Sequence, residues 1–275
     1  MGWKESLLDM LREDVGRGDI TSKAILPKNF KVKGTIIAGE PGTAAGLSEA
    51  KWLFEQRGLR ARLKVEDGKQ FRRNEALLEV TGNAVKVFEA ERTALNIIGR
   101  MSGIATETAK ATATVRRAGG KAKIAATRKT ILRWLDKKAV VMGGGFPHRL
   151  GLYDAILIKT THVWLAGSIE RAIVLARKNA PGKKIEVEAS SAKEAMEAAR
   201  SGANIVMFDN FSHTEIRKTF KLLKDSGLRR RIKVEISGGI TPSNLKNYAG
   251  YDADLISMGS LTHSPKWLQV SMRVC

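Results

Sequence analysis

The sequence predicts an α/β protein in which an α+β domain precedes an incomplete barrel of parallel strands. Two observations support this. The first hundred or so residues mix helical patterns with extended segments in no regular order. After Gly120, apolar segments alternate with helical patterns every 20 to 30 residues or so, roughly the length of a β-α unit. Only about six strands are visible, fewer than a closed barrel needs. We therefore expect something else to cover the gap, such as the N-terminal domain of a partner subunit.

The first part of the chain opens with a predicted helix over residues 3–12, where Leu7, Leu8 and Leu11 recur at helical spacing. A second helix is predicted over 48–56, and a long one from 84 to about 101 leads into the second half. Turn residues separate the extended segments between them. These extended segments are residues 32–38, 61–65 and 76–80.

The second part contains six strand-like segments, nearly all followed by a polar residue or a glycine. In a parallel barrel the carboxyl ends of the strands meet on one rim, where such folds keep their active sites. We therefore expect cations, carboxylates and glycines to gather there around an anionic ligand. The segments are residues 123–127, 155–158, 185–187, 204–208, 232–236 and 255–258.

The chain is strongly basic, with a formal net charge of +20. This charge suits nucleic acid, an anionic membrane face or a strongly anionic small substrate. Aromatic residues make up only 6%, too few for obvious base-stacking platforms, so we expect no nucleic-acid partner.

The only cysteine is Cys275, which excludes an intrachain disulfide. With no candidate membrane span or signal peptide, a cytoplasmic location is expected.

Two carboxylates at strand ends are candidate metal ligands. Glu188 follows one predicted strand and Asp209 follows the next, while Glu186 lies two residues before Glu188 and shares its face. Mg²⁺ is usually held by one or two carboxylates together with substrate phosphate oxygens. Glu188 and Asp209 are therefore candidates for contacts with Mg²⁺ or a ribose diphosphate. Pairing with rim lysines is the alternative, above all for Glu186.

Glycine turns follow the last two strands, at Ser237-Gly238-Gly239 and at Gly259-Ser260. Barrels often bind phosphate at these two positions through backbone N–H groups and helix N-termini. Thr241 is a candidate N-cap of the helix after the first turn. Two such turns on consecutive strands favour a phosphate site.

Cations cluster in sequence around two further positions. Arg128 and Lys129 follow one strand, and His148 and Arg149 precede another. Two arginines suit a dicarboxylate, because each guanidinium binds a carboxylate through a planar pair of donors. His148 is either a neutral donor in the site or a structural histidine in a turn.

Taken together, these motifs resemble the quinolinate phosphoribosyltransferase family, also called nicotinate-nucleotide pyrophosphorylase (carboxylating). The resemblance spans nearly the whole chain, and the order and spacing of the short motifs make it specific. The motifs are residues 13–21 (EDVGRGDIT), 91–96 (ERTALN), 127–130 (TRKT), 144–152 (GGFPHRLGL), 158–159 (IK), 186–188 (EVE), 209–210 (DN), 237–240 (SGGI) and 259–264 (GSLTHS).

The resemblance implies an N-terminal α/β sandwich domain over residues 1–104, with the tail 265–275 packed on it, and an open α/β barrel over 105–264. It also implies a homodimer in which each subunit completes the other's site. The implied reaction joins quinolinate to phosphoribosyl pyrophosphate with Mg²⁺ and gives nicotinate mononucleotide, pyrophosphate and CO₂, a step of NAD biosynthesis.

Residue by residue, the resemblance assigns the dicarboxylate to Arg128, Lys129, His148 and Arg149, with Arg92 supplied by the neighbouring subunit. It assigns the ribose pyrophosphate and its metal to Lys159, Glu188 and Asp209, and the 5′-phosphate to the turns. The expected catalytic residues are Lys129, Lys159, Glu188 and Asp209. The turn residues are Ser237, Gly238, Gly239, Gly259 and Ser260.

Two departures from the family pattern leave alternatives open. The Thr-Pro-Gly turn that usually follows Thr130 is missing, and Thr160-Thr161 replaces Asp-Asn after Lys159. Phe146-Pro147 is similar to a related group associated with molybdenum transport, although Lys159 favours the transferase. A nicotinate phosphoribosyltransferase is a second enzyme hypothesis, and a basic nucleic-acid-binding protein is the non-enzymatic one.

Overall fold

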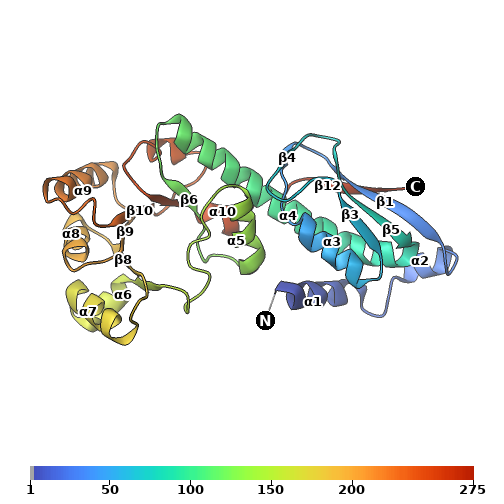
Figure 1. Ribbon diagram of the computed structural model, residues 1–275, viewed down its shortest axis with the longest axis horizontal. Coiled ribbons are helices and arrows are strands. Elements are labelled where there is room, and N and C mark those ends of the chain that lie inside the picture. The colour runs from blue at the N-terminus through green and yellow to red at the C-terminus, as the bar shows by residue number, and fades with distance from the viewer. Residues whose placement is uncertain (1–2) are drawn as a thin grey trace. The chain divides into compact units, whose positions relative to one another are not determined.

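The computed structural model describes residues 3–275, so residues 1 and 2 of the expected N-terminal domain lie outside the described residues. The chain divides into two compact units (Figure 1). The first unit contains the chain up to Ala109, Ile131–Gly144 and Ser264–Cys275. The second contains Lys110–Thr130 and Gly145–His263.

The first unit is built on an antiparallel sheet in the order β12-β1-β5-β3, with a separate two-stranded pair β2-β4. Helix and sheet are mixed as the sequence predicts, and each predicted element is present, with bounds shifted by a few residues except at the end of α4. Its elements are α1 (Trp3–Val15), α2 (Ile20–Ile25), β1 (Lys31–Ala38), β2 (Gly42–Thr43), α3 (Leu47–Gln56), β3 (Arg60–Leu63), β4 (Gln70–Phe71), β5 (Ala76–Asn83), most of α4 (Ala84–Arg117), α5 (Arg133–Met142) and β12 (Val270–Val274).

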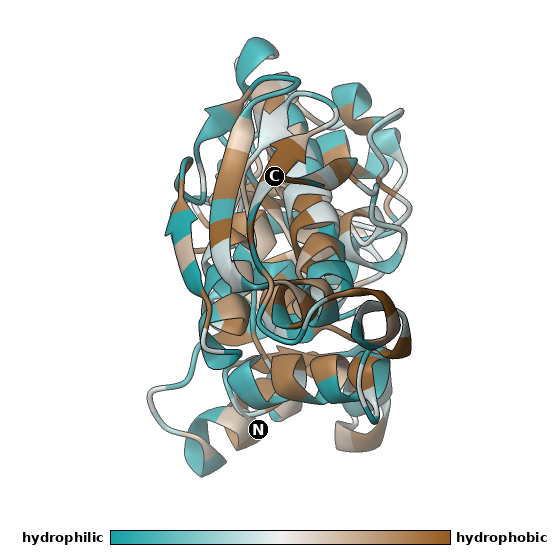
Figure 2. Ribbon diagram, turned by 90° about the vertical axis from the view of Figure 1, so that its right-hand side faces the viewer, coloured by the Kyte–Doolittle hydropathy of each residue, from teal (hydrophilic) through white to brown (hydrophobic). Residues whose placement is uncertain are grey.

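Strand β1 shows why this sheet forms. Buried and more exposed residues alternate along it, with Val32, Ile36 and Ala38 on the buried side. A period of two puts these side chains on one face of the sheet. Figure 2 shows the same interleaving of hydrophobic and hydrophilic residues along helices and strands.

Helix α4 extends well past the predicted end near residue 101, to Arg117. Two glycines on this helix let the C-terminal tail approach it closely. The backbone N–H of Leu268 donates to the carbonyl of Gly99 at 3.0 Å, and a Cβ at Gly103 would lie 1.8 Å from the carbonyl oxygen of Lys266. The tail then ends as β12, which pairs with β1.

Residues 131–144 differ from the sequence-based boundary, which placed all of residues 105–264 in the barrel. The structure assigns this segment to the first unit. Asp136 on α5 accepts two hydrogen bonds from Arg100 on α4, both at 2.8 Å, and Lys138 pairs with Glu49 on α3 at 2.6 Å. Ion pairs formed over long sequence separations, which no local pattern reveals, tie α5 to the first unit.

The second unit is a six-stranded sheet in the order β6-β11-β10-β9-β8-β7, with every neighbouring pair parallel. The six predicted strands are confirmed, and β6 and β7 are the two edges of an open sheet. Helices α7, α8 and α9 lie outside β8–β10 (Figure 1). Its elements are β6 (Lys123–Ala125), β7 (Ile156–Ile158), α6 (Thr160–Ala166), α7 (Ile169–Asn179), β8 (Ile185–Ala189), α8 (Ala192–Arg200), β9 (Ile205–Asp209), α9 (His213–Asp225), β10 (Lys233–Ser237), the 3₁₀ helix η1 (Leu245–Asn247), β11 (Leu255–Ser257) and α10 (Ser260–His263).

Serine N-caps start three of the helices that return between strands. The side chains of Ser168, Ser191 and Ser212 accept hydrogen bonds from the third backbone N–H of α7, α8 and α9. Such caps satisfy donors that the helix itself leaves unpaired. The expected N-cap at Thr241 is wrong, because Asn244 precedes a short 3₁₀ helix there and its Oδ1 accepts from the Thr241 N–H.

None of the helices in residues 3–275 combines the length and apolar character required to span a membrane.

We predict that Gly103→Ala destabilises the first unit, although alanine normally favours a helix over glycine. The new Cβ would overlap the Lys266 carbonyl, so either α4 or the tail must move. We expect a loss of about 1–3 kcal/mol in the free energy of unfolding, as for other overpacked sites. Urea unfolding measures it. Gly250→Ala, where a Cβ meets nothing within 4 Å, is the control. Equal stability of the two variants would contradict the close approach.

Candidate active site

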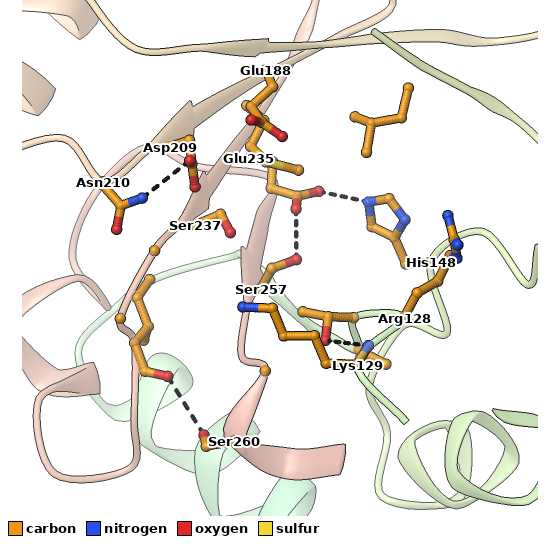
Figure 3. Close-up of a pocket in the computed structure, with 18 of the residues that line it drawn as sticks. Arg128, Lys129, His148, Glu188, Asp209, Asn210, Glu235, Ser237, Ser257 and Ser260 are labelled. Atoms are coloured by element: carbon orange, nitrogen blue, oxygen red, sulfur yellow. Dashed lines mark hydrogen bonds and ion pairs between the residues drawn. The ribbon is translucent and has the colours of Figure 1, made fainter. Parts of the chain in front are cut away.

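One pocket of about 590 Å³ lies at the carboxyl ends of the parallel strands and is lined entirely by the second unit. It brings together residues that lie more than a hundred positions apart in sequence (Figure 3). Every predicted site residue except Arg92 lines it. These residues are Arg128, Lys129, His148, Arg149, Lys159, Glu188, Asp209, Ser237, Gly238, Gly239, Gly259 and Ser260.

Arg92 lies on α4 in the first unit, exposed to solvent and absent from the pocket lining. The expected role of Arg92, contact with the dicarboxylate in the site of a neighbouring subunit, therefore stays a prediction.

Two carboxylates and a lysine form one side of the pocket. Lys159 Nζ donates to Glu188 Oε2 at 2.8 Å. Burial raises the pKa of Asp209, and the negative charge of Glu188 raises it further, while a hydrogen bond from Asn210 and the charges of Lys159 and Lys129 lower it. The carboxylates of Glu188 and Asp209 therefore lie close enough to repel each other. A cation between them would relieve this repulsion.

Asn210 holds Asp209 in place; the family motif at residues 209–210 includes it, but the resemblance assigns it no role in the site. Its Nδ2 donates to Asp209 Oδ2 at 3.0 Å, and its backbone N–H donates to the carbonyl of Ser237. Its φ of 57° is in the left-handed region that asparagine tolerates better than most residues. A Cβ on Gly238 would lie 2.3 Å from Asn210 Oδ1, so only glycine fits there.

The two glycine turns form a further part of the pocket wall, and Gly238 lies against Asn210. Gly238 and Gly239 have φ values of 103° and 59°, both in the region that favours glycine. Ser260 Oγ donates to the carbonyl of Ile240, which links the two turns (Figure 3). The glycine backbone thus faces the pocket with no side chain in between, as anion-binding turns require.

The cationic side begins with the loop after β6. The Lys129 N–H donates to Thr127 Oγ1 at 3.2 Å, and Thr262 Oγ1 on α10 donates to the Lys129 carbonyl at 3.1 Å. The loop that lacks the Thr-Pro-Gly turn is therefore tethered to α10. Arg128 Nε is buried and has no hydrogen-bond partner among the described residues, which leaves a donor for a ligand.

The guanidinium of Arg149 is close to that of Arg128. Burial lowers the pKa of Arg149, the positive charge of Arg128 lowers it further, and the negative charge of Glu186 raises it. Two neighbouring guanidiniums form a preorganised site for two carboxylates.

His148 lies between two buried glutamates. Its Nε2 is 3.1 Å from Glu235 Oε2 and 3.2 Å from Glu186 Oε2, and its Nδ1 accepts a hydrogen bond from the Arg149 N–H at 2.9 Å. Glu186 therefore pairs with this histidine rather than with a rim lysine. Both ring nitrogens of His148 have partners inside the protein.

This cluster holds an extra proton. Burial lowers the pKa of His148, but hydrogen bonds and negative charge from Glu186 and Glu235 outweigh it and raise the pKa to about 10. Burial likewise raises the pKa of Glu186. Since the Arg149 N–H points at Nδ1, the ring proton lies on Nε2, the nitrogen that faces both carboxylates. His148, Glu186 and Glu235 also have the composition of a metal site, and the atoms that face one another lie at hydrogen-bond distance.

Glu235 and Ser257 line the pocket and were missed in the sequence. Ser257 Oγ donates to Glu235 Oε1 at 2.6 Å. The available signal was a glutamate inside an apolar strand, between Val234 and Ile236, matching Glu186 between Ile185 and Val187. A charged residue in such a run requires a buried partner.

An open α/β barrel with cations, paired carboxylates and glycine turns around one pocket defines an enzyme that binds phosphorylated anions. The chain matches the model of the quinolinate phosphoribosyl transferase C-terminal domain over residues 104–273 and that of the N-terminal domain over 19–102. It belongs to the quinolinate phosphoribosyltransferase family.

Individual relatives agree with this membership. The chain is 38% identical to a probable nicotinate-nucleotide pyrophosphorylase [carboxylating] of Methanothermobacter thermautotrophicus, over 97% of this chain and 96% of that protein. It is 36% identical to the nicotinate-nucleotide pyrophosphorylase [carboxylating] of Mycobacterium leprae, over 98% and 96%. A crystal structure of NadC from Streptococcus pyogenes superposes with a TM-score of 0.90 at 35% identity, covering 98% of this chain and 95% of that one.

We predict that the proton held by the His148 cluster makes stability depend on pH. The folded pKa of about 10 lies above the ordinary value of 6.5. The stabilisation is therefore fully present below about pH 6.5 and is lost as the pH rises through about 10, and the raised pKa of Glu186 acts in the same direction. The slope is at most about 1.4 kcal/mol per pH unit for one proton.

Urea unfolding from pH 6 to 10 tests this, with His148→Asn as the comparison. Asparagine tolerates the φ of 54° at this position but does not titrate. The difference in unfolding free energy between wild type and variant should shrink as the pH rises. Parallel curves would contradict the assignment.

Proposed function

We propose that this protein is a quinolinate phosphoribosyltransferase, which transfers phosphoribosyl from phosphoribosyl pyrophosphate to quinolinate with loss of CO₂, in NAD biosynthesis. Family membership and the near full-length similarity to carboxylating pyrophosphorylases support this. The observation that carries it is the pairing, in one pocket, of a two-arginine side with a lysine and two carboxylates. The two arginines suit a dicarboxylate, and the lysine with the two carboxylates suits a ribose pyrophosphate. The reaction uses only water-soluble metabolites, which favours a cytoplasmic location.

The chemistry requires orientation and charge stabilisation rather than a covalent nucleophile. The pyridine nitrogen attacks the anomeric carbon, the bond from that carbon to the pyrophosphate oxygen breaks, and pyrophosphate leaves. The sugar is cationic in the transition state, and the carboxylate of Glu188 stabilises this charge. Lys159, bonded to Glu188, orients it and contacts the ribose pyrophosphate. The turns at Gly238-Gly239 and Gly259-Ser260 hold the 5′-phosphate.

Decarboxylation follows on the quaternised ring. The bond to the carboxyl group beside the nitrogen breaks, CO₂ leaves, and the electron pair remains next to the positive nitrogen until a proton is taken up. Arg128 and Arg149 bind the two carboxylates, and Lys129 holds the departing one in position. Holding the reacting groups in this geometry is the main contribution of these side chains.

Glu188 and Asp209 would hold Mg²⁺ together with pyrophosphate oxygens. The mutual repulsion of the two carboxylates fits a cation at this place, as does their oxygen chemistry. When bound, the ion neutralises charge on the departing pyrophosphate.

A second copy of the chain is the proposed partner. Large apolar side chains are exposed in the second unit near its open edge strand β7, with 75–81% of each residue's surface accessible. Such exposure is typical of a surface that another protein covers. A neighbouring subunit bound there would supply Arg92 to the site. The exposed residues are Leu152, Tyr153, Trp164 and Leu165.

CO₂ release from ring-carboxyl-labelled quinolinate, with Mg²⁺ and phosphoribosyl pyrophosphate, tests the proposed function. We expect one CO₂ for each nicotinate mononucleotide formed, and no turnover of nicotinate in a parallel reaction. Consumption of nicotinate without CO₂ would instead make the protein a nicotinate phosphoribosyltransferase. Turnover of neither compound would contradict both assignments.

We predict that Asp209→Asn raises the Mg²⁺ concentration needed for half-maximal turnover at least about tenfold, because one of two carboxylate ligands is lost. Titrating Mg²⁺ at saturating substrates measures this. The control is Asp225→Asn, an exposed carboxylate that pairs with Lys221 at 2.8 Å. An unchanged Mg²⁺ requirement in the Asp209 variant would exclude it as a ligand.

We predict that two inactive variants complement each other when mixed. Arg92→Ala and Lys159→Ala each remove one half of a shared site. If Arg92 acts in the neighbouring subunit, a mixed dimer contains one intact site, so random exchange restores about a quarter of wild-type turnover. Denaturing and refolding the two together, with each variant alone as the control, measures it. Absence of recovery would place both residues in one chain's site.

A further inference from the structure

Two carboxylates lie buried beneath a pocket that is built to attract anions. Glu235 is fully buried and Glu186 is 4% exposed. Buried carboxylates are costly unless they are paired, and here they also oppose the binding of a dianion. Neither pairs with the Lys159–Glu188 group. Glu186 does not line the pocket, and both carboxylate oxygens of Glu235 are engaged by Ser257 and His148, so substrate contact does not explain their position.

A continuous line of hydrogen bonds leads from the strands to the arginine side of the pocket. Ser257 on β11 donates to Glu235 on β10, Glu235 contacts His148 Nε2, and His148 Nδ1 accepts from the Arg149 N–H. Figure 3 shows the part from Ser257 through Glu235 to the imidazole. Glu186 on β8 contacts the same Nε2. The imidazole of His148 is thus held at Nε2 by side chains from β8 and β10 and at Nδ1 by the backbone N–H of Arg149.

The backbone at His148 needs this support. Its φ of 54° is in the left-handed region, which a non-glycine residue adopts only at a cost in free energy. The turn directs Arg149 toward the pocket, where its Nη1 donates to the Ala155 carbonyl at 3.3 Å. An untethered imidazole would let this turn relax, and the guanidinium would move with it.

Charge adds a second constraint. Arg149 lies near the positive charge of Arg128 and near the negative charge of Glu186. Like charges repel strongly where water is excluded, so two neighbouring guanidiniums separate unless a counter-charge is present. Glu186 supplies this counter-charge from behind the pocket wall. It does not line the pocket, so the space between the guanidiniums and the ligand remains open.

We propose that Glu235 and Glu186 are positioning residues for the dicarboxylate: through His148 they hold the turn that presents Arg149, and Glu186 keeps Arg149 beside Arg128. This inference rests on the proposed function and adds residues and a role to it. It also makes His148 a support for Arg149 rather than a direct donor to the substrate, because both ring nitrogens are already engaged.

The first test is Glu235→Gln, which keeps the shape of the side chain and removes its charge. We expect the KM for quinolinate to rise at least about tenfold, the usual effect of losing a hydrogen bond to a charged group. The KM for phosphoribosyl pyrophosphate should stay within about twofold, since Lys159, Glu188 and the turns are untouched. Equal rises in both KM values, or no rise in that for quinolinate, would overturn the proposal.

The matched control is Glu49→Gln. Glu49 is 2% exposed and also loses a buried ion pair, with Lys138, but it belongs to the first unit and does not line the pocket. The Glu49→Gln variant should lose stability without a selective change in the KM for quinolinate.

If Glu235→Gln fails to fold, Ser257→Ala removes only the hydroxyl that holds Glu235. Ser257→Ala should give a smaller rise in the KM for quinolinate than Glu235→Gln, again without a change in that for phosphoribosyl pyrophosphate. The absence of this rise would count against the proposal.

A double-mutant cycle tests whether Glu235 acts through Arg149. In an Arg149→Lys background, Glu235→Gln should change the KM for quinolinate by less than about twofold, because the group that it positions is already gone. Additive effects of the two substitutions on the KM for quinolinate would overturn the inference that Glu235 acts through Arg149.

Wild-type CO₂ release, measured first, separates the proposed function from the positioning role. No release contradicts the proposed function, whereas release together with an unselective Glu235 variant contradicts only the positioning role.

Discussion

The parallel register of six strands is the constraint on which the site depends. Hydrogen bonding pairs Ser237 with Asp209 and Glu188 with Met207, so the ends of β8, β9 and β10 lie at one edge. Side chains that follow different strands therefore meet, whatever their distance in sequence. A shift of one strand by one residue would turn its side chains to the other face and remove them from the pocket.

The pocket combines opposite charges instead of presenting one sign. Cations alone would attract any polyanion, and the chain has many of them, with 48 lysines and arginines. On the proposed function, the carboxylates of Glu188 and Asp209 favour a ligand that brings a cation or becomes cationic. Behind the wall, Glu186 balances Arg149 without occupying ligand space, while Glu235 lines the pocket with both carboxylate oxygens engaged by Ser257 and His148. Selectivity here comes from where the negative groups are placed.

The chain reaches this arrangement despite a shorter loop after β6 than its family pattern has. The tether from Thr262 to the Lys129 carbonyl holds Arg128 and Lys129 at the pocket without the missing turn. After β7, Thr160 and Thr161 begin α6 and are exposed, while the Lys159 N–H donates to His162 Nδ1 at 2.9 Å. Lys159 is thereby fixed at the strand end although the neighbouring acidic residue is absent.

Much of the fold and most of the pocket were predictable, since strands and the polar residues that end them are local features. Arg128, Lys159, Glu188, Asp209 and the glycine turns follow from position alone, given a parallel sheet. Tertiary structure decided what depends on contacts over long sequence separations: α5 joins the first unit, His148 meets two glutamates, and Glu235 is a buried charge with partners rather than an interruption of a strand. Burial and pairing decide the role of a charge, and both are set by residues elsewhere in the chain.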